Sequence, residues 1–185
     1  MARGRVSWGM LLPTVSFNGS PRVSDLWAVA KGADRAGFAS LWVTEGILRP
    51  GSTLEVLSVM AAAAARTRRV RVCSGVLVLP LRNPVLLAQA VATVDQLSGG
   101  RVVLGVGVGT FRSEFQVAGV PFAERGARAD ESIRILRRLW QGGSVTFRGR
   151  FFTLEDVRLD PPPVQTPPPI WVGGRSLGAL RRAAR

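Results

Sequence analysis

The sequence predicts an α/β fold built on a parallel sheet, in a single domain of 185 residues. Three observations support this prediction. Short apolar runs alternate with segments whose apolar residues recur at helical spacing, which is the pattern of strand-helix units. Start and stop signals flank the helical segments. The length suits one domain, and no apolar stretch reaches the roughly 18 residues that a membrane helix needs.

Five stretches are predicted to be strands of that sheet. They are Val6–Leu12, Ser40–Thr44, Val70–Leu79, Val102–Val108 and Ile170–Val172. A helical segment follows each, which gives five βα units, whereas a closed (β/α)₈ barrel has eight in about 250 residues. Two architectures therefore stay open. The pattern alone favours an open, doubly wound five-stranded sheet, and the alternative is a barrel that lacks its last units.

The first two helices follow from apolar spacing and from caps. One face of the first helix, predicted to start at a Ser24 cap, carries apolar residues at i, i+3, i+4 and i+7: Leu26, Val29, Ala30 and Ala33. The second helix is predicted to start at a capping box, in which Ser52 and Glu55 satisfy each other's main-chain N–H groups. It then runs through the alanine block at residues 61–65.

The third helix has the clearest signals. Asn83 is placed to cap it, Pro84 fits its first turn, and Gly99–Gly100 ends it. The stretch at 111–126, FRSEFQVAGVPFAERG, is predicted to be irregular. A fourth helix follows it, on the apolar spacing of Ala129, Ile133, Leu136 and Trp140.

The C-terminal part adds a hairpin, a connector and a helix. The alternating sequence SVTFRGRFFTLED predicts a β-hairpin that turns at Arg148-Gly149, inserted between a helix and a strand. The proline-rich connector Pro161–Pro169 is expected to be extended. The segment LGALRRAAR at 177–185 is predicted to be the last helix.

The net charge of +13 first suggests nucleic acid as a partner. However, Lys31 is the only lysine, and arginines occur in nearly every segment, which is more typical of a compositional bias than of a binding patch. The densest group is Arg66, Arg68, Arg69 and Arg71. We therefore predict no specific nucleic-acid partner, only non-specific attraction of polyanions at low salt. An arginine-rich nucleic-acid binder stays as the weakest alternative.

Cysteine and histidine usage restricts the chemistry further. The chain has one cysteine, Cys73, and no histidine, so we expect neither an internal disulfide nor a metal site. Cys73 lies in a β-branched strand and is expected to be inert core. Near the N-terminus, Pro13 interrupts the apolar run and no cleavage site follows, which predicts a cytoplasmic protein with no membrane association.

Candidate functional residues follow the strands, because sites on parallel sheets gather at the carboxyl ends of the strands. The sequence GVGVGT does not match the dinucleotide-binding motif G-x-G-x-x-G, because a motif that starts at Gly107 needs its third glycine at position 112, which is Arg112. The sequence also lacks the Gly-Lys-Ser/Thr of a phosphate-binding Walker loop. Its glycines either relieve crowding or make room for a ligand. Glu114 is expected to fix a loop rather than to act as a catalytic acid.

Two further candidates have two interpretations each. The GGRS segment, Gly173–Ser176, precedes a helix, so its N–H groups could bind an anion, or Ser176 could be an ordinary cap. Glu45 follows the second strand and could orient a polar ligand, or it could be a solvated loop acid. The residues alone favour neither interpretation.

Several long stretches together resemble the luciferase-like monooxygenase family, which includes bacterial luciferase and deazaflavin-dependent oxidoreductases. They are AARTRRVRV, LVLPLRNPVLLAQAVATVDQLSGGRVVLGVGVG, EFQVAGVPFAERGARADE, FRGRFFTLEDVRLDPPPVQ and PPIWVGG. They cover nearly the whole chain in order.

The resemblance implies a TIM (β/α)₈ barrel with a flavin or deazaflavin across the carboxyl ends of its strands, often in a homodimer. It also implies a non-proline cis peptide at Gly75-Val76, forming a bulge behind the cofactor ring. Glu45 would be the acidic residue after the second strand and the weak candidate for catalysis. The cofactor-binding positions implied are Glu45, Gly75, Val76, Asn83, Gly107, Gly109, Thr110, Gly173, Gly174, Arg175 and Ser176.

The implied activity is an oxidoreduction of a small organic substrate. The cofactor is either the deazaflavin coenzyme F420, which would transfer a hydride, or FMN, which would support oxygenation. The form of LVLPLRNPVLLAQ with GVGVG favours F420, and FMN stays open. The substrate is not predicted.

The chain departs from the family in two ways. Gly46 follows Glu45 where many members have a histidine, so a histidine-based proton transfer is not available here. Family members also continue with three further βα units, so we expect a truncated member with impaired activity, whose first and fifth strands are unpaired edges. The alternative is a non-catalytic subunit that pairs with another chain to complete a barrel.

Overall fold

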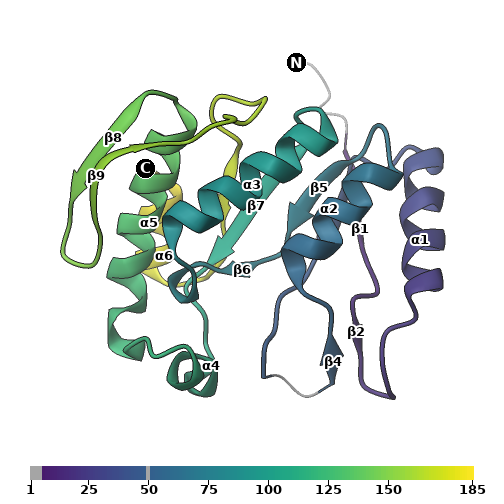
Figure 1. Ribbon diagram of the computed structural model, residues 1–185. Helices are drawn as coiled ribbons and strands as arrows, with labels where there is room; N and C mark the ends of the chain where they lie inside the picture. The colour runs from purple at the N-terminus through teal and green to yellow at the C-terminus, as the bar shows by residue number, and fades with distance from the viewer. Residues whose placement is uncertain (1–5, 49–50) are drawn as a thin grey trace.

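The computed structural model describes residues 6–48 and 51–185, and its centre is a parallel sheet (Figure 1). The main strands are β1 (Gly9–Leu11), β3 (Ser40–Val43), β5 (Arg71–Ser74), β7 (Val102–Gly107) and β10 (Ile170–Val172). They lie side by side in the order in which they occur in the chain, and every neighbouring pair is parallel. As expected, the first and last of these strands form the two edges of the sheet.

The strand order distinguishes between the two architectures. A doubly wound sheet reverses its strand order at a switch point, whereas here each strand is added on the same side as the one before. Crossovers of one hand that advance in one direction place their helices on one face of the sheet. The preference for a doubly wound sheet is therefore wrong, because strand-helix alternation alone does not encode the direction of the crossovers. The sheet is an arc of a barrel.

The helices cover the outer face of this arc. They are α1 (Val23–Ala36), α2 (Val56–Arg66), α3 (Pro84–Ser98), α5 (Arg125–Trp140) and α6 (Leu177–Ala183). Contacts join α1 to α2, α2 to α3 and α3 to α5, and Figure 1 shows α1, α2 and α3 in a row in front of the sheet. An ion pair between Arg182 and Asp130 joins α6 to α5. The helices therefore follow one another around the arc.

Alternate residues of the strands face the two sides of the sheet. Leu41, Val72 and Leu104 are fully buried beneath the helices. On the opposite side, Trp42 and Trp171 approach each other with ring centroids 5.4 Å apart, and Trp171 is 52% exposed. The inner face of the arc is therefore aromatic and only partly covered by the described residues.

The starts of the first two helices differ from the prediction. Ser24 lies inside α1, which begins after Arg22 without a side-chain cap. Ser52 lies in the short strand β4 (Ser52–Thr53), which pairs antiparallel with β2 (Val15–Ser16), so no capping box forms. Instead, Glu55 itself caps α2 and accepts a hydrogen bond from the main-chain N–H of Ser58 at 2.7 Å. The local sequence signal could not show that Ser52 is used by a strand pair.

The predicted ends of α3 are confirmed. The side-chain oxygen of Asn83 accepts hydrogen bonds from the N–H groups of Val85 and Leu86, and Gly99 ends the helix with a φ of 67°. α5 is also confirmed, but the stretch before it is not irregular. It contains α4 (Arg112–Val117) and the 3₁₀ turn η2 (Phe122–Glu124).

The first and third predicted strands are shorter than expected. β1 begins only at Gly9. The expected strand Val70–Leu79 divides at the cis peptide Gly75-Val76 into β5 and β6 (Leu77–Val78), and β6 pairs with β7 before the 3₁₀ turn η1 (Leu79–Leu81). The cis peptide that the resemblance implied is therefore confirmed at this bond.

The hairpin is confirmed as β8 (Ser144–Arg148) and β9 (Thr153–Arg158). The connector is not uniformly extended, because it has bends and cis bonds at Asp160-Pro161 and Thr166-Pro167. Gln165 anchors it: its main-chain and side-chain N–H groups donate to the buried carboxylate of Asp95 at 2.8 and 2.7 Å. This anchor on α3 places β10 beside β7.

Much of the basic cluster after α2 has structural roles. Asp34 of α1 accepts hydrogen bonds from the main-chain N–H groups of residues 68, 69 and 70, at 3.1, 2.9 and 3.0 Å. Burial would raise the pKa of Asp34, but these N–H groups outweigh it and hold the pKa below its ordinary value. Arg66 lies over the ring of Trp27 at 4.4 Å. The main-chain hydrogen bonds to Asp34 and the contact of Arg66 with Trp27 therefore stabilise the joint between α1, α2 and β5.

Candidate active site

A pocket of about 420 Å³ opens at the carboxyl ends of β1 and β3. The short strands β2 and β4 form one side, and the segment after β7 contributes Phe111. The lining residues are Leu11, Leu12, Pro13, Val15, Phe17, Thr44, Glu45, Thr53 and Phe111. Ligand pockets typically measure roughly 300–1,000 Å³ and are mainly apolar with a few polar groups. This pocket fits that description, with Thr44, Thr53 and Glu45 as its polar side chains.

Glu45 is buried at the base of this pocket and is held by an ion pair. Its carboxylate accepts hydrogen bonds from the main-chain N–H of Val78 and from Arg82. Arg82 also contacts Glu55 at 3.0 Å. Burial would lower the pKa of Arg82, but the two carboxylates outweigh burial and raise the pKa. Glu45 therefore joins the end of β3 to β6, and this geometry suits a positioning residue better than a proton-transfer group.

The bulge after β5 places Val76 against two of the predicted site glycines. A Cβ atom on Gly107 would lie 2.8 Å from Cγ2 of Val76, and one on Gly173 would lie 2.9 Å from Cγ1. Gly75 itself lies beneath Trp42. These glycines thus allow the bulge to pack between the ends of β7 and β10. These contacts support the interpretation that the glycines relieve crowding inside the protein, and their role in making room for a ligand stays a prediction.

The segment after β7 turns back over the strand ends. Gly109 has a φ of +77°, and a Cβ atom there would lie 2.7 Å from Cγ1 of Val78, so glycine is required both by conformation and by space. Thr110 is exposed, and Phe111, 41% exposed, reaches the pocket.

Glu114 fixes this segment, as the sequence predicted. It is buried on α4, and its carboxylate accepts a hydrogen bond from the main-chain N–H of Ile47 at 3.1 Å. The loop after β3 is thereby tied to the segment after β7. The two loops that carry Glu45 and Phe111 are held in a fixed relation.

Several residues of the pocket escaped the sequence analysis. Thr44 lines the pocket, and its hydroxyl lies 3.1 Å from that of the fully buried Thr14. Leu11 and Phe111 are large apolar residues that stay 58% and 41% exposed. Leu11 ends β1 and Phe111 follows β7 by four residues, so their places near strand ends were the available signal. Apolar residues in such places resemble core residues until the fold shows that they are exposed.

Other predicted site residues lie elsewhere. Asn83 is exposed and caps α3, and Ser176 caps α6 by accepting from the N–H of Ala179 at 3.2 Å. Gly174 and Arg175 are exposed beside Ser176. Among the predicted cofactor-binding residues, all of which the structure describes, Glu45 alone lines the pocket. The binding of the others to the cofactor stays a prediction.

Metal ligands and membrane spans are not found within residues 6–48 and 51–185. No group of three or more His, Cys, Asp or Glu side chains is arranged to hold a metal ion there. No helix in this part of the chain is long and apolar enough to cross a membrane. Cys73 is buried, and burial raises the pKa of its thiol to about 12 although Arg71 opposes the shift.

The chain is similar to enzymes that use two different cofactors. An F420-dependent glucose-6-phosphate dehydrogenase of Amycolatopsis mediterranei is 39% identical in an alignment 169 residues long, which covers 87% of this chain and 50% of that enzyme. The FMNH₂-dependent dimethylsulfone monooxygenase of Pseudomonas putida is 32% identical in a gapped alignment 188 residues long, which covers 97% of this chain and 51% of that enzyme.

Solved structures agree with the arc. The crystal structure of a monooxygenase from Streptomyces bottropensis matches with a TM-score of 0.80 and 29% identity, over 90% of this chain and 53% of that protein. The chain thus spans about half the length of the relatives it matches. The family model described as luciferase-like monooxygenase matches residues 7–185. With nearly all of its sequence matched and its strands arranged as the arc of a barrel, this chain belongs to the luciferase-like monooxygenase family.

Proposed function

We propose that this chain supplies one wall of a flavin-type cofactor site in an oxidoreductase that acts on a small organic substrate. The observation that carries the proposal is the apolar pocket of about 420 Å³ at the carboxyl ends of β1 and β3. Its apolar sides suit a flat ring system, and its position matches the usual place of active sites on barrels.

The residues would divide the work as follows. Leu11 and Phe111 would contact the apolar ring, and the bulge at Gly75-Val76 would support it from behind. Thr44 would offer a hydroxyl, while Glu45, held by Arg82, would orient polar groups of the ligand. Gly173–Ser176 would meet the phosphate-bearing part of the cofactor. When bound, the cofactor would supply the redox chemistry, as hydride transfer with F420 or oxygenation with FMN.

F420 is the cofactor we favour, and FMN is the alternative. The F420-dependent relative has the higher identity of the two compared above, 39% against 32%. Both cofactors present a flat tricyclic ring, so the pocket alone does not separate them.

Cofactor titration tests this proposal. We expect saturable quenching of F420 or FMN fluorescence by the chain. Replacing Leu11, which is 58% exposed, by Glu should weaken binding at least tenfold, because a charge would be buried against an apolar ring. The matched control is Leu97→Glu on α3, where the leucine is 56% exposed and does not line the pocket. Equal affinity in the two variants, or no binding of either cofactor, would refute the proposed site.

A second candidate function is a non-catalytic subunit that completes a barrel with another chain. The observation that favours it is the exposed inner face, where Leu11 is 58% and Trp171 is 52% exposed. Sedimentation at increasing concentration tests it. Association that Trp171→Glu abolishes, without cofactor binding by the wild type, would favour this candidate. A monomer that binds cofactor would exclude it.

A further inference from the structure

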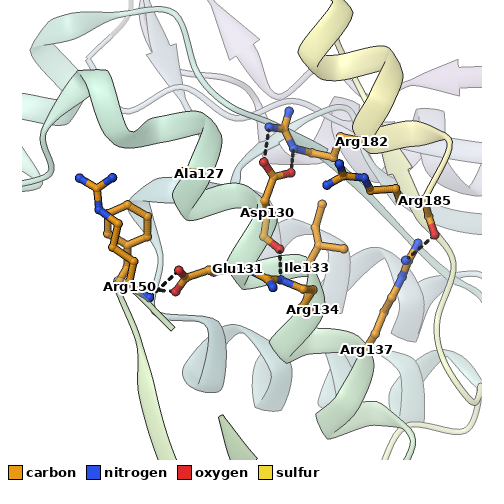
Figure 2. A pocket seen from close by; sticks show the side chains of 10 residues that line it. Ala127, Asp130, Glu131, Ile133, Arg134, Arg137, Arg150, Arg182 and Arg185 are labelled. Atoms are coloured by element: carbon orange, nitrogen blue, oxygen red, sulfur yellow. Dashed lines mark hydrogen bonds and ion pairs between the residues drawn. The ribbon is translucent and has the colours of Figure 1, made fainter. Parts of the chain in front are cut away.

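A second pocket, of about 370 Å³, lies on the outer side of the arc between α5, the turn of the β8–β9 hairpin and α6. It shares no lining residue with the candidate active site. Five arginines line it together with two carboxylates: Arg134, Arg137, Arg150, Arg182 and Arg185, with Asp130 and Glu131. Figure 2 shows these side chains around the hollow.

Both carboxylates are already occupied. Asp130 accepts two hydrogen bonds from Arg182, at 2.7 and 3.3 Å, and Figure 2 shows the two side chains facing each other. Glu131 is 5% exposed and accepts from the main-chain N–H groups of Arg150 and Phe151 at 2.7 and 3.0 Å. These contacts fix the walls of the pocket, because Asp130 holds α6 and Glu131 holds the hairpin turn.

Among the described residues, two of the arginines have no carboxylate side chain as a partner and donate only to main-chain oxygens. Nε of Arg134 donates to the main-chain oxygen of Asp130 at 3.4 Å, and its guanidinium lies 5.5 Å from the ring of Phe147. Nη1 of Arg137 donates to the main-chain oxygen of Arg185 at 3.0 Å. Within the described part of the chain, no carboxylate side chain forms an ion pair with Arg134 or Arg137.

The side chains that line the pocket therefore include five guanidinium groups and two carboxylates, a surplus of three positive side-chain charges. Like charges gathered in one hollow repel one another, and an anion between them removes that repulsion. Guanidinium groups present paired N–H donors that match the oxygens of a phosphoryl group. The volume exceeds what a phosphate ion alone would fill.

We propose that this pocket binds the phosphoryl group of a small phosphate ester, with Arg134 and Arg137 as its principal ligands. Arg150, whose side chain is 72% exposed, would close the rim. The site is independent of the cofactor pocket, and the proposal does not rest on the proposed function.

Calorimetric titration with inorganic phosphate at about 0.15 M ionic strength, where distant surface charges are largely screened, tests the proposal. We expect saturable binding at one site. The double variant Arg134→Gln/Arg137→Gln should weaken it at least tenfold. The control, Arg35→Gln/Arg181→Gln, removes the same charge from exposed positions that do not line the pocket, and should change the affinity less than twofold.

Three outcomes would overturn the proposal: no saturable binding, unchanged affinity in the pocket variant, or an equal loss in both double variants, which would indicate the general field of the protein. If circular dichroism shows that the pocket double variant is unfolded, the single variant Arg134→Gln replaces it. Arg134 is exposed, so this change leaves the core intact, and we expect at least threefold weaker binding. Cofactor quenching should be the same in all of these variants, which separates failure of this site from failure of the cofactor site.

Discussion

Replacing Gly107 by Ala tests whether the end of β7 is shaped by the bulge beside it. The backbone of Gly107 lies outside the left-handed region, so alanine is tolerated by conformation, and in a strand it should gain roughly 0.5–1 kcal/mol over glycine. The new Cβ atom, however, would lie 2.8 Å from Cγ2 of Val76. Such overpacking costs about 1–3 kcal/mol. We therefore expect a net loss of about 1–2 kcal/mol in the free energy of unfolding.

A double-mutant cycle isolates the contact. The next nearest atom to the new Cβ is Cβ of Val76 at 3.7 Å, which is an ordinary contact, so Val76→Ala should remove the clash. In that background, Gly107→Ala should be neutral or slightly stabilising, with a coupling free energy of about 1–2 kcal/mol. Urea unfolding followed by circular dichroism measures all four proteins. If Gly107→Ala destabilises both backgrounds equally, or neither, the packing argument is wrong.

Three further predictions concern the anchor at Gln165, the stability of the protein at acidic pH and the reactivity of the Cys73 thiol. Gln165→Ala removes the two side-chain hydrogen bonds of Gln165, one to the buried carboxylate of Asp95 and one to the main-chain oxygen of Val102. It should lower the free energy of unfolding by about 2–3 kcal/mol in urea, and an unchanged value would refute the anchor. The pKa values of Asp34 and Glu55 are lowered on folding, so their stabilisation is complete above the ordinary values of 3.8 and 4.5 and is lost as the pH falls below them. The melting temperature should thus fall as the pH is lowered from about 5 to 3, and it should fall less steeply in the Asp34→Asn variant than in the wild type. An equally steep fall in both proteins would contradict the role given to Asp34. Cys73, with a pKa raised to about 12, should react with a thiol reagent at pH 8 only after unfolding, and rapid labelling of the folded chain would show that its burial is wrong.

The fold was predictable where a signal is local. Asn83 and Pro84 predicted the start of α3 because a side-chain cap and a first-turn proline act within a few residues. The capping box predicted at Ser52 was wrong because Ser52 pairs in a β-ladder with Ser16, which is distant in the sequence. The strand pair replaced the local capping motif. The direction of the crossovers, which separates a barrel arc from a doubly wound sheet, depends on how whole units pack and has no local signal.

The candidate site was predictable in part for the same reason. Glu45 could be placed at the end of a strand, but its partner Arg82 lies 37 residues further along the chain, so its commitment to an ion pair appeared only in the fold. The surplus of arginines could be counted from the sequence, whereas the gathering of Arg134 and Arg137 with α6 could not. Apolar lining such as Phe111 is indistinguishable from core in a sequence.

Hydrogen-deuterium exchange with and without cofactor tests most directly whether the chain holds a flavin-type ring at the carboxyl ends of its strands. With saturating F420 or FMN, we expect slower exchange at residues 11–15, 44–47, 76–78 and 107–111, which surround the pocket and the bulge. Residues 130–137, next to the arginine-lined pocket, should exchange at an unchanged rate. Protection confined to residues 130–137, or no protection by either cofactor, would contradict the central claim.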